Sequence, residues 1–225
     1  APWTTGTSLD YARELLRYWR EDFDWRAQEA RLNALPQYTV ELDGIELHFI
    51  HAPGRCPNPQ PLLLSHGWPG SVIEFLELIP LLTERFTVVA PSLPGYTLSF
   101  RHGQPRFSVE AMADTFARLM TEVLGYPRFV AQGGDWGAFV TTRLAATRPA
   151  LVGGIHLNFL IVPREPFTPQ TPDEAQWQAQ LEHWTRERAA YAHIQGTRPQ
   201  TLGYGLADSP AGQMAWIVEK FWAWC

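Results

Sequence analysis

One nine-residue stretch constrains the fold of this chain more than any other: AQGGDWGAF, residues 131–139. An apolar run leads into two glycines, an acidic residue and then a segment with a helical pattern. This order predicts a strand, a sharp turn and a helix, the arrangement that lifts a nucleophilic side chain above the edge of a parallel sheet. The residue at the tip of the turn is Asp135, so the nucleophile expected here is a carboxylate.

The segments on either side of this stretch predict a mostly parallel sheet. YTVELDGIELHFIH holds two alternating runs joined by Asp43 and Gly44, which predicts a β-hairpin. Strand and helix patterns then alternate: we expect strands at PLLLSH, FTVVAP, RFVAQGG and VGGIHLNF, and helices over 72–82, after Ser108 and over 137–147. This alternation predicts an α/β fold with helices on both faces of the sheet.

Three parts are expected along the chain. Residues 1–36 form an N-terminal helical segment, and residues 37–165 form the sheet with its helices. The proline-rich passage VPREPFTPQTPDE then breaks the alternation, and the pattern beyond it is helical and aromatic. We therefore expect residues 166–225 to begin a helical cap inserted into the fold.

Composition excludes several classes of function. The net charge is −5 and there is no run of lysines or arginines, so nucleic acid is not an expected partner. No apolar stretch approaches the ~20 residues that cross a bilayer. Cys56 and Cys225 form neither a metal-type pair nor a disulfide framework, which favours a cytoplasmic location. No metal or organic cofactor is expected.

Asp135 has two interpretations. Aspartate is a good N-cap, so this residue could simply cap the helix that follows it. The stretch SHGWPGS, residues 65–71, favours a catalytic role, because it follows a strand at the place where such sheets provide one oxyanion-hole N–H, here that of Trp68. The second N–H comes from the residue after the nucleophile, Trp136. Glycines let these turns form and pack closely: Gly67, Gly133, Gly134 and Gly137.

A carboxylate nucleophile suits attack on a saturated carbon. It displaces a leaving group and forms an alkyl ester with the enzyme, which water then hydrolyses at the ester carbonyl. The Trp68 and Trp136 N–H groups would bind the oxyanion that develops in this second step. A serine would give an ether, which water does not readily cleave.

The chain resembles the microsomal-type epoxide hydrolases, a branch of the α/β-hydrolase fold. GIELHFIH, HGWPGS, PSLPGY, GGDWGA and GIHLN match this family in order, and YWREDFDWRAQEARLNALPQY is similar to its N-terminal segment. YAHIQGTRPQTLGYGLADSPAG, followed by WIVEKFWAW, is similar to its cap. PGYTLSF departs from the family, which usually has a glycine and an aromatic residue after the tyrosine; altered packing or substrate shape is expected there.

The resemblance implies a set of roles. Asp135 would be the nucleophile, Trp68 and Trp136 would form the oxyanion hole, and Tyr191 in the cap would be the acid. The substrates would be a small apolar epoxide and water, and the product a vicinal diol. A phenol suits this acid role because, with a pKa of ~10, it donates a proton while staying neutral at pH 7.

The resemblance also implies a histidine and an acid after the cap, and usually a second cap tyrosine. No segment of these 225 residues is similar to that region. His66 is expected to make a structural contact, His156 to be a buried core histidine, and His193 has no evident acid partner. We therefore expect the sequence to be part of a longer chain, or else a protein that cannot complete turnover.

Two other functions remain open from the sequence. Haloalkane dehalogenases also use an aspartate elbow followed by tryptophan, but a halide leaves without a proton, so the phenol of Tyr191 favours an epoxide. A non-catalytic relative would bind an apolar ligand in the same cavity without forming an ester. Detoxifying and biosynthetic epoxide hydrolases would share these motifs.

Overall fold

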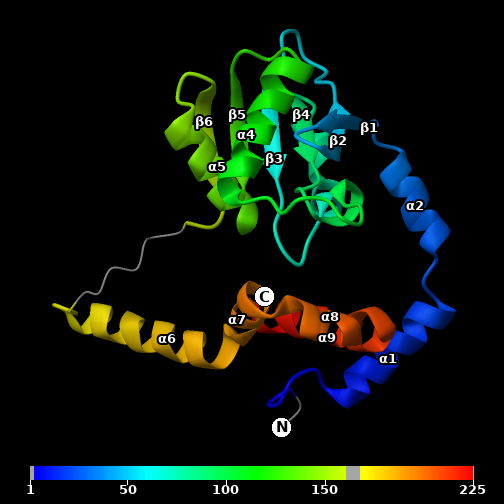
Figure 1. Ribbon diagram of the computed structural model, residues 1–225, viewed down its shortest axis with the longest axis vertical. Coiled ribbons are helices and arrows are strands. Elements are labelled where there is room, and N and C mark those ends of the chain that lie inside the picture. Colours follow the sequence, from blue (N-terminus) through cyan, green and yellow to red (C-terminus); the bar gives the residue numbers. More distant parts are fainter. Residues whose placement is uncertain (1–2, 161–167, 225) are drawn as a thin grey trace. The chain divides into compact units, whose positions relative to one another are not determined.

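The computed structural model describes residues 3–160 and 168–224. Contacts within the chain group it into two units: residues 25–163, and residues 1–24 together with 164–225 (Figure 1). The first unit contains the sheet, and the second is helical. The three-part division expected from the sequence stays a prediction, since the contacts join the start of the chain to its last helices.

The sheet has six strands among the described residues, in the order β1-β2-β4-β3-β5-β6. β1 and β2 pair antiparallel, as do β2 and β4, whereas β4, β3, β5 and β6 are parallel neighbours. The mostly parallel sheet with an N-terminal hairpin is therefore confirmed. The strands are β1 Gln37–Leu42, β2 Ile45–Ala52, β3 Gln60–Ser65, β4 Phe86–Pro91, β5 Phe129–Gly133 and β6 Val152–Leu157.

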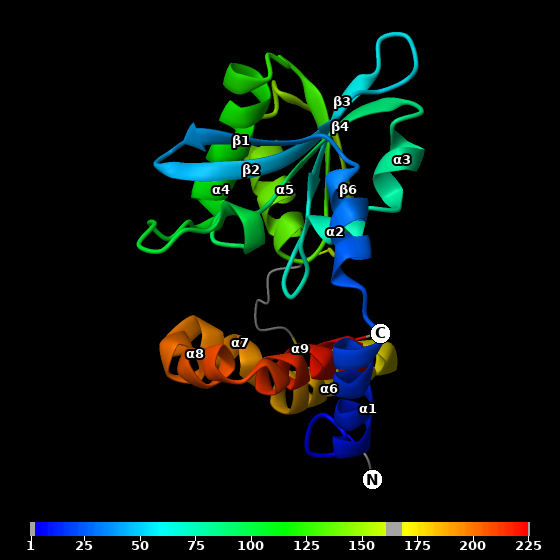
Figure 2. The ribbon, with the colours of Figure 1, turned by 90° about the vertical axis from the view of Figure 1, so that its right-hand side faces the viewer.

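Helices cover both faces of this sheet (Figure 2). Because successive strand residues point to opposite faces, Leu63 packs in one apolar cluster and Leu62 and Leu64 in another. The first cluster contains residues of α4 Val109–Arg118 and α5 Trp136–Thr147, and the second contains residues of η1 Val72–Phe75 and α3 Leu78–Leu82. This unit also holds α2 Trp25–Asn33, the short helix η2 Thr97–Ser99 and η3 Leu119–Val123, a π-helical turn that continues α4.

The helix predicted over 72–82 is wrong in one respect, because the structure divides it into η1 and α3. Pro80 lies in the first turn of α3, where its missing N–H costs no hydrogen bond. In one continuous helix Pro80 would sit in the interior and interrupt the backbone bonds. Ser71 does begin the segment, since its Oγ accepts a hydrogen bond from the Ile73 N–H at 3.3 Å.

β6 is an edge strand of the described sheet, and its side chains are largely exposed. Ile155 is 44% exposed, and its neighbour His156 is also exposed. The prediction that His156 is a buried core residue is therefore wrong. An apolar strand pattern does not by itself show whether the strand has a neighbouring strand on both sides.

The helical unit brings the N-terminal residues against the last helix. The Thr7 Oγ1 donates to the Ala215 carbonyl at 2.7 Å, and the rings of Trp3 and Trp222 stack with centroids 4.9 Å apart. Its helices are α1 Leu9–Glu21, α6 Pro172–Arg188, α7 Ala190–Thr197, α8 Pro199–Asp208 and α9 Pro210–Trp224. In α6, Thr171 and Glu174 form a reciprocal capping box.

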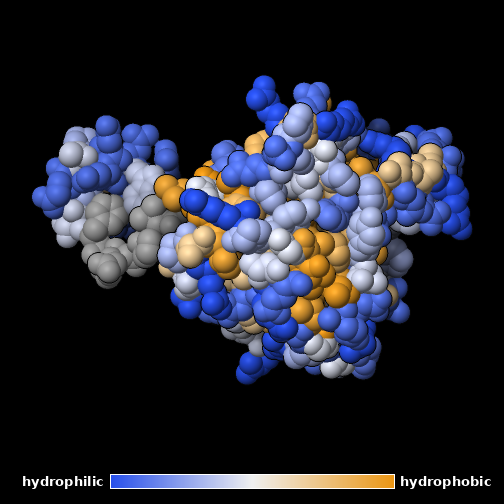
Figure 3. Space-filling view, turned by 90° about the horizontal axis from the view of Figure 1, so that it is seen from above, coloured by the Kyte–Doolittle hydropathy of each residue, from blue (hydrophilic) through white to orange (hydrophobic). Residues whose placement is uncertain are grey.

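No helix in the described ranges combines the length and the apolar character needed to cross a bilayer. The face shown in Figure 3 is mostly hydrophilic, with hydrophobic patches between the polar groups. Long aliphatic side chains of the strands are buried instead in the two apolar clusters.

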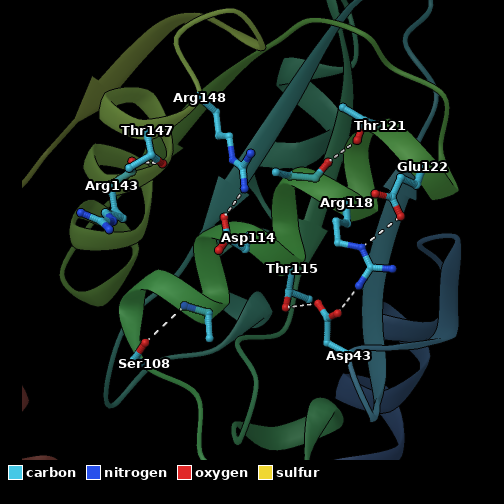
Figure 4. A network of polar contacts seen from close by, with 12 residues as sticks. Asp43, Ser108, Asp114, Thr115, Arg118, Thr121, Glu122, Arg143, Thr147 and Arg148 are labelled. Atoms are coloured by element: carbon cyan, nitrogen blue, oxygen red, sulfur yellow. Dashed lines mark hydrogen bonds and ion pairs between the residues drawn. The ribbon is translucent and has the colours of Figure 1, made fainter.

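The β1–β2 turn is held by a polar network that includes α4 (Figure 4). Asp43 has a φ of 51° and Gly44 a φ of 78°, as expected for the Asp-Gly hairpin turn. Thr115 Oγ1 donates to Asp43 Oδ2 at 2.6 Å, and Arg118 pairs with the same carboxylate. Arg118 Nε also donates to Glu122 at 3.0 Å, so the turn and the helix share one network.

We predict that Asp43→Ala lowers the free energy of unfolding by about 1–2 kcal/mol. Alanine tolerates the left-handed backbone less well than aspartate, and the Thr115 hydrogen bond is lost. Urea unfolding followed by tryptophan fluorescence measures the change. Asp43→Asn is the matched control, because asparagine keeps the backbone preference and one acceptor, and it should cost less than alanine. Equal losses in the two variants would contradict this explanation.

We also predict that His48 makes stability depend on pH. His48 is 5% exposed, and its ring nitrogens lie 2.9 Å from Ser92 Oγ and 2.9 Å from Gln37 Oε1. Burial lowers the pKa of His48 to about 4. The unfolded chain, with a histidine pKa of ~6.5, then binds more protons than the folded chain between these two values.

The free energy of unfolding should therefore rise as the pH increases from about 4 to about 6.5 and gain nothing from this group above that range. Burial lowers the pKa values of His51 and His66 as well, so they act in the same direction. Urea unfolding at several pH values measures the slope, which should be shallower in His48→Gln. An unchanged slope in that variant would contradict the role of His48.

Candidate active site

The turn after β5 holds Asp135 in an unusual backbone conformation. β5 ends at Gly133 and α5 begins at Trp136, so Asp135 occupies the tip of a strand–turn–helix. Its φ is 50° and its ψ is −124°. A non-glycine residue with positive φ is strained, and such strain clusters at functional sites. This geometry agrees with the strand–turn–helix elbow expected from the sequence.

The glycines around Asp135 are required by close backbone approaches. A Cβ atom added to Gly133 would lie 2.1 Å from the Gly137 carbonyl oxygen, and one added to Gly137 would lie 1.9 Å from the Ser65 carbonyl oxygen. At Gly134 the added atom would lie 2.3 Å from Asn158 Oδ1. These distances are far inside van der Waals contact, so the ends of β3, β5 and β6 approach the elbow only because these side chains are absent.

The loop after β3 contacts the Asp135 carboxylate directly. The backbone N–H of Trp68 donates to Asp135 Oδ1 at 2.8 Å. A Cβ atom added to Gly67 would lie 2.4 Å from both Cβ and Oδ1 of Asp135. The two carboxylate oxygens are therefore distinguished: Oδ1 already has a backbone donor of the kind expected in an oxyanion hole.

The structure does not support the interpretation that the Asp135 side chain caps α5. Asp135 stands at the N-cap position of α5, but its side chain makes no capping hydrogen bond there. The carboxylate is instead bonded to Trp68, a residue 67 positions away in the sequence. Trp136 is the first residue of α5; its side chain is 43% exposed and lies 5.5 Å from the Phe139 ring. The oxyanion role of its N–H stays a prediction.

His66 is buried beside the elbow but both of its ring nitrogens are occupied. The Leu93 N–H donates to Nε2 at 3.0 Å, which leaves Nδ1 as the protonated nitrogen, 3.0 Å from the Gly67 carbonyl. Burial lowers the pKa of His66, while the Gly67 hydrogen bond and Asp135 raise it to a smaller extent. His66 thus connects the loops after β3 and β4 and has no lone pair with which to activate water.

Two residues near Asp135 were not identified from the sequence. Burial raises the pKa of Tyr96 to about 12, with a further contribution from the charge of Asp135. Burial and the charge of Asp135 also raise the pKa of the Glu74 carboxyl, and the backbone N–H groups of Ser71 and Gly67 oppose this. Glu74 lies in the helix predicted over 72–82 and Tyr96 lies in PGYTLSF, and neither local pattern indicates that the side chain is close to Asp135.

A hollow of about 560 Å³ adjoins Trp136 on the sheet unit. It is bordered by the segment between β4 and α4, including Tyr96, Phe100 and Phe107. Aromatic side chains provide a large apolar contact area for a ligand. The PGYTLSF departure noted in the sequence thus lies in a segment that lines this hollow.

Tyr191 belongs to the helical unit, on α7. Its ring lies 5.1 Å from that of Trp224, and the Lys220 Nζ lies 5.2 Å from its ring centroid. Asp135 belongs to the other unit, the one that contains the sheet. The pairing of Tyr191 with Asp135 across one substrate stays a prediction.

Within residues 3–160 and 168–224, no three histidine, cysteine, aspartate or glutamate side chains gather in a way that could hold a metal ion. A mostly parallel sheet with an elbow after β5 and a donor loop after β3 defines the α/β-hydrolase class.

Comparison with known proteins agrees with this class and narrows it. A family model described as "alpha/beta hydrolase fold" matches residues 60–201, and one described as "Epoxide hydrolase N terminus" matches residues 1–75. The chain belongs to the epoxide hydrolase family of the α/β-hydrolase fold.

Individual relatives support the same assignment. The chain is 36% identical over 252 residues to Epoxide hydrolase 1 of Oryctolagus cuniculus, covering 97% of this chain and 55% of that protein. It is 48% identical over 234 residues to a protein of Stigmatella aurantiaca that carries the epoxide hydrolase name, covering 99% of this chain and 53% of that one. The solved structure of Aspergillus niger epoxide hydrolase matches with a TM-score of 0.85 and 35% identity, over 96% of this chain and 59% of that one. The chain spans about half the length of the curated relatives it matches.

We predict that Gly67→Ala disturbs the elbow. The added methyl group would overlap the Asp135 side chain, so the loop or the carboxylate must move, at a cost of roughly 1–3 kcal/mol of unfolding free energy. Urea unfolding measures this cost. Gly154→Ala is the matched control, because its added Cβ would meet nothing closer than 3.9 Å. A Gly67→Ala chain as stable as the Gly154→Ala chain would contradict the packing described here.

Proposed function

We propose that this chain carries the ester-forming half of an epoxide hydrolase, with Asp135 as the nucleophile. The observation that carries the proposal is the Trp68 N–H bonded to Oδ1 of a carboxylate at the tip of the elbow. In a chain of the epoxide hydrolase family, this arrangement supports a carboxylate that becomes an ester during the reaction.

In the proposed first step, Asp135 Oδ2 attacks one carbon of the epoxide ring. The bond between that carbon and the ring oxygen breaks, and the ring oxygen takes the phenolic proton of Tyr191. The products are a hydroxyalkyl ester on Asp135 and the Tyr191 phenolate. Oδ1 becomes the ester carbonyl oxygen and keeps the Trp68 N–H, which supports Oδ2 as the attacking atom.

In the proposed second step, water attacks the ester carbonyl carbon. Negative charge then develops on Oδ1, where the Trp68 N–H and, in our proposal, the Trp136 N–H stabilise it. Release of the diol frees one proton, which returns to the Tyr191 phenolate, so the sum is epoxide plus water to diol. Because His66 has no free lone pair, we assign the activation of water to the histidine and acid that the family carries after its cap.

The hollow beside Trp136 supports an apolar epoxide as the substrate. Tyr96, Phe100 and Phe107 border it, and aromatic walls favour an apolar substituent next to the reacting carbon. The phenol of Tyr191 supports an epoxide over a haloalkane, because a halide leaves without accepting a proton.

We predict that incubation with styrene oxide adds one epoxide mass to the chain, on the peptide that contains Asp135. Intact-mass and peptide mass spectrometry after a brief incubation measure the adduct. Asp135→Asn should abolish it, because an amide is a poor nucleophile. Asp114→Asn is the matched control: this aspartate pairs with Arg148 on the outside of the sheet unit and should leave the adduct unchanged.

Three results would contradict the proposal. An adduct retained in Asp135→Asn would place the nucleophile elsewhere. Saturable binding of styrene oxide without any adduct would favour a non-catalytic relative that uses the same cavity. Release of chloride from a chloroalkane, with no ester from the epoxide, would favour a haloalkane dehalogenase.

A further inference from the structure

Lys220 is the sole lysine of the sequence. It lies on α9 and is 7% exposed. Among the described residues it is the one member of the Asp, Glu, Lys and Arg group that is buried. Burying a charge is costly unless specific partners compensate it, so the surroundings of Lys220 indicate its role.

The Lys220 ammonium lies between an aromatic pair and one carboxylate. Its Nζ is 5.2 Å from the ring centroid of Tyr191 and 4.9 Å from that of Trp216. It also forms an ion pair with Glu219, the preceding residue of α9. Both ring distances lie within the ~6 Å over which a cation interacts with an aromatic face. All four residues belong to the helical unit.

A cation at this position acts through its charge. An ammonium is a compact point charge and a guanidinium is planar and delocalised, but each carries one positive charge. A positive charge within ~4–6 Å of an acid favours its ionised form. By the same rule, a positive charge close to a phenol favours the phenolate over the neutral phenol.

We propose that Lys220 is a positioning residue that promotes transfer of the Tyr191 proton to the ring oxygen of a bound epoxide. This inference rests on the proposed function, in which Tyr191 is the acid. As the epoxide C–O bond breaks, the proton passes from the Tyr191 oxygen to the ring oxygen, and the phenolate charge develops close to the Lys220 ammonium. The proton released in ester hydrolysis restores the phenol.

Other charged groups moderate this effect. Glu219 opposes it, because its carboxylate partly neutralises the ammonium. From α6, His183, Glu187 and Arg188 border the same hollow, of about 930 Å³, as Glu219 and Lys220. The Arg188 guanidinium is directed elsewhere: it donates to the Ala223 carbonyl at 2.7 Å and lies 5.8 Å from the Trp222 ring. Lys220 is thus a cation placed over the Tyr191 ring, whereas Arg188 lies over Trp222.

The test is a titration of Tyr191 by NMR in the chain labelled with ¹³C at the tyrosine Cζ. Tyr191→Phe identifies its signal. In Lys220→Met we expect Tyr191 to ionise roughly one pH unit higher than in the unmodified chain, since one charge at this distance shifts an acid by about that amount. Lys220→Arg keeps a cation over the ring and should restore most of the difference.

Two controls separate this effect from a general loss of structure. Tyr204 lies on α8 in the same unit, is 68% exposed and accepts a hydrogen bond from Gln200 at 2.8 Å, so its titration should not move. Glu219→Gln removes the opposing charge and should shift Tyr191 to lower pH. This variant also tests the proposal if Lys220→Met does not fold. A Tyr191 titration that is unchanged in Lys220→Met, or in Glu219→Gln where Lys220→Met does not fold, would overturn the inference.

The rate of ester formation on Asp135 distinguishes this inference from the proposed function. If the unmodified chain forms the styrene oxide adduct, we expect Lys220→Met to slow it about tenfold and Lys220→Arg to recover it. An adduct formed at the same rate in Lys220→Met would overturn the inference and leave the proposed function standing. Absence of the adduct in the unmodified chain would contradict the proposed function, while the NMR titration would still decide whether Lys220 acts on Tyr191.

Discussion

The approach of two backbone segments at the edge of the sheet is the constraint on which the rest of the site depends. The loop after β3 and the elbow after β5 come so close that a methyl group on Gly67 would overlap Asp135, and one on Gly137 would overlap the Ser65 carbonyl. This closeness brings the Trp68 N–H to 2.8 Å from Asp135 Oδ1. In the proposed mechanism, a backbone donor placed in this way needs no reorganisation when charge develops on that oxygen.

Burial and the charge of Asp135 act together on the polar groups around the elbow. Burial raises the pKa values of Tyr96 and Glu74, and the charge of Asp135 adds to this, which favours their neutral forms beside the carboxylate. Burial lowers the pKa of His66 more than the Gly67 hydrogen bond and the charge of Asp135 raise it, which favours the neutral imidazole. Its hydrogen bond from Leu93 connects the loops after β3 and β4, so His66 has a structural role beside the elbow. In the proposed mechanism, the hydrolytic step therefore needs a different base.

In the helical unit, residues distant in the sequence surround the phenol ring of Tyr191. Tyr191 on α7 lies against Trp224 and beneath the ammonium of Lys220, both on α9. N-terminal residues complete the unit, as the Thr7 bond to Ala215 shows. One unit thus holds the proposed nucleophile on a rigid sheet edge, and the other holds the proposed acid in an aromatic and charged environment.

The sequence by itself determined the elbow, its aspartate, the hairpin turn and the mostly parallel sheet, because these follow from local steric requirements and from residue periodicity. Gly133 and Gly137 lie where a side chain would clash with the backbone, and Asp43 and Gly44 have the positive φ angles of a tight hairpin turn. Only the tertiary structure decided that His156 is exposed, that both nitrogens of His66 are engaged and that the lone lysine lies over Tyr191. These features depend on which strands and helices become neighbours, and local sequence patterns do not encode contacts between residues that meet only after the chain has folded.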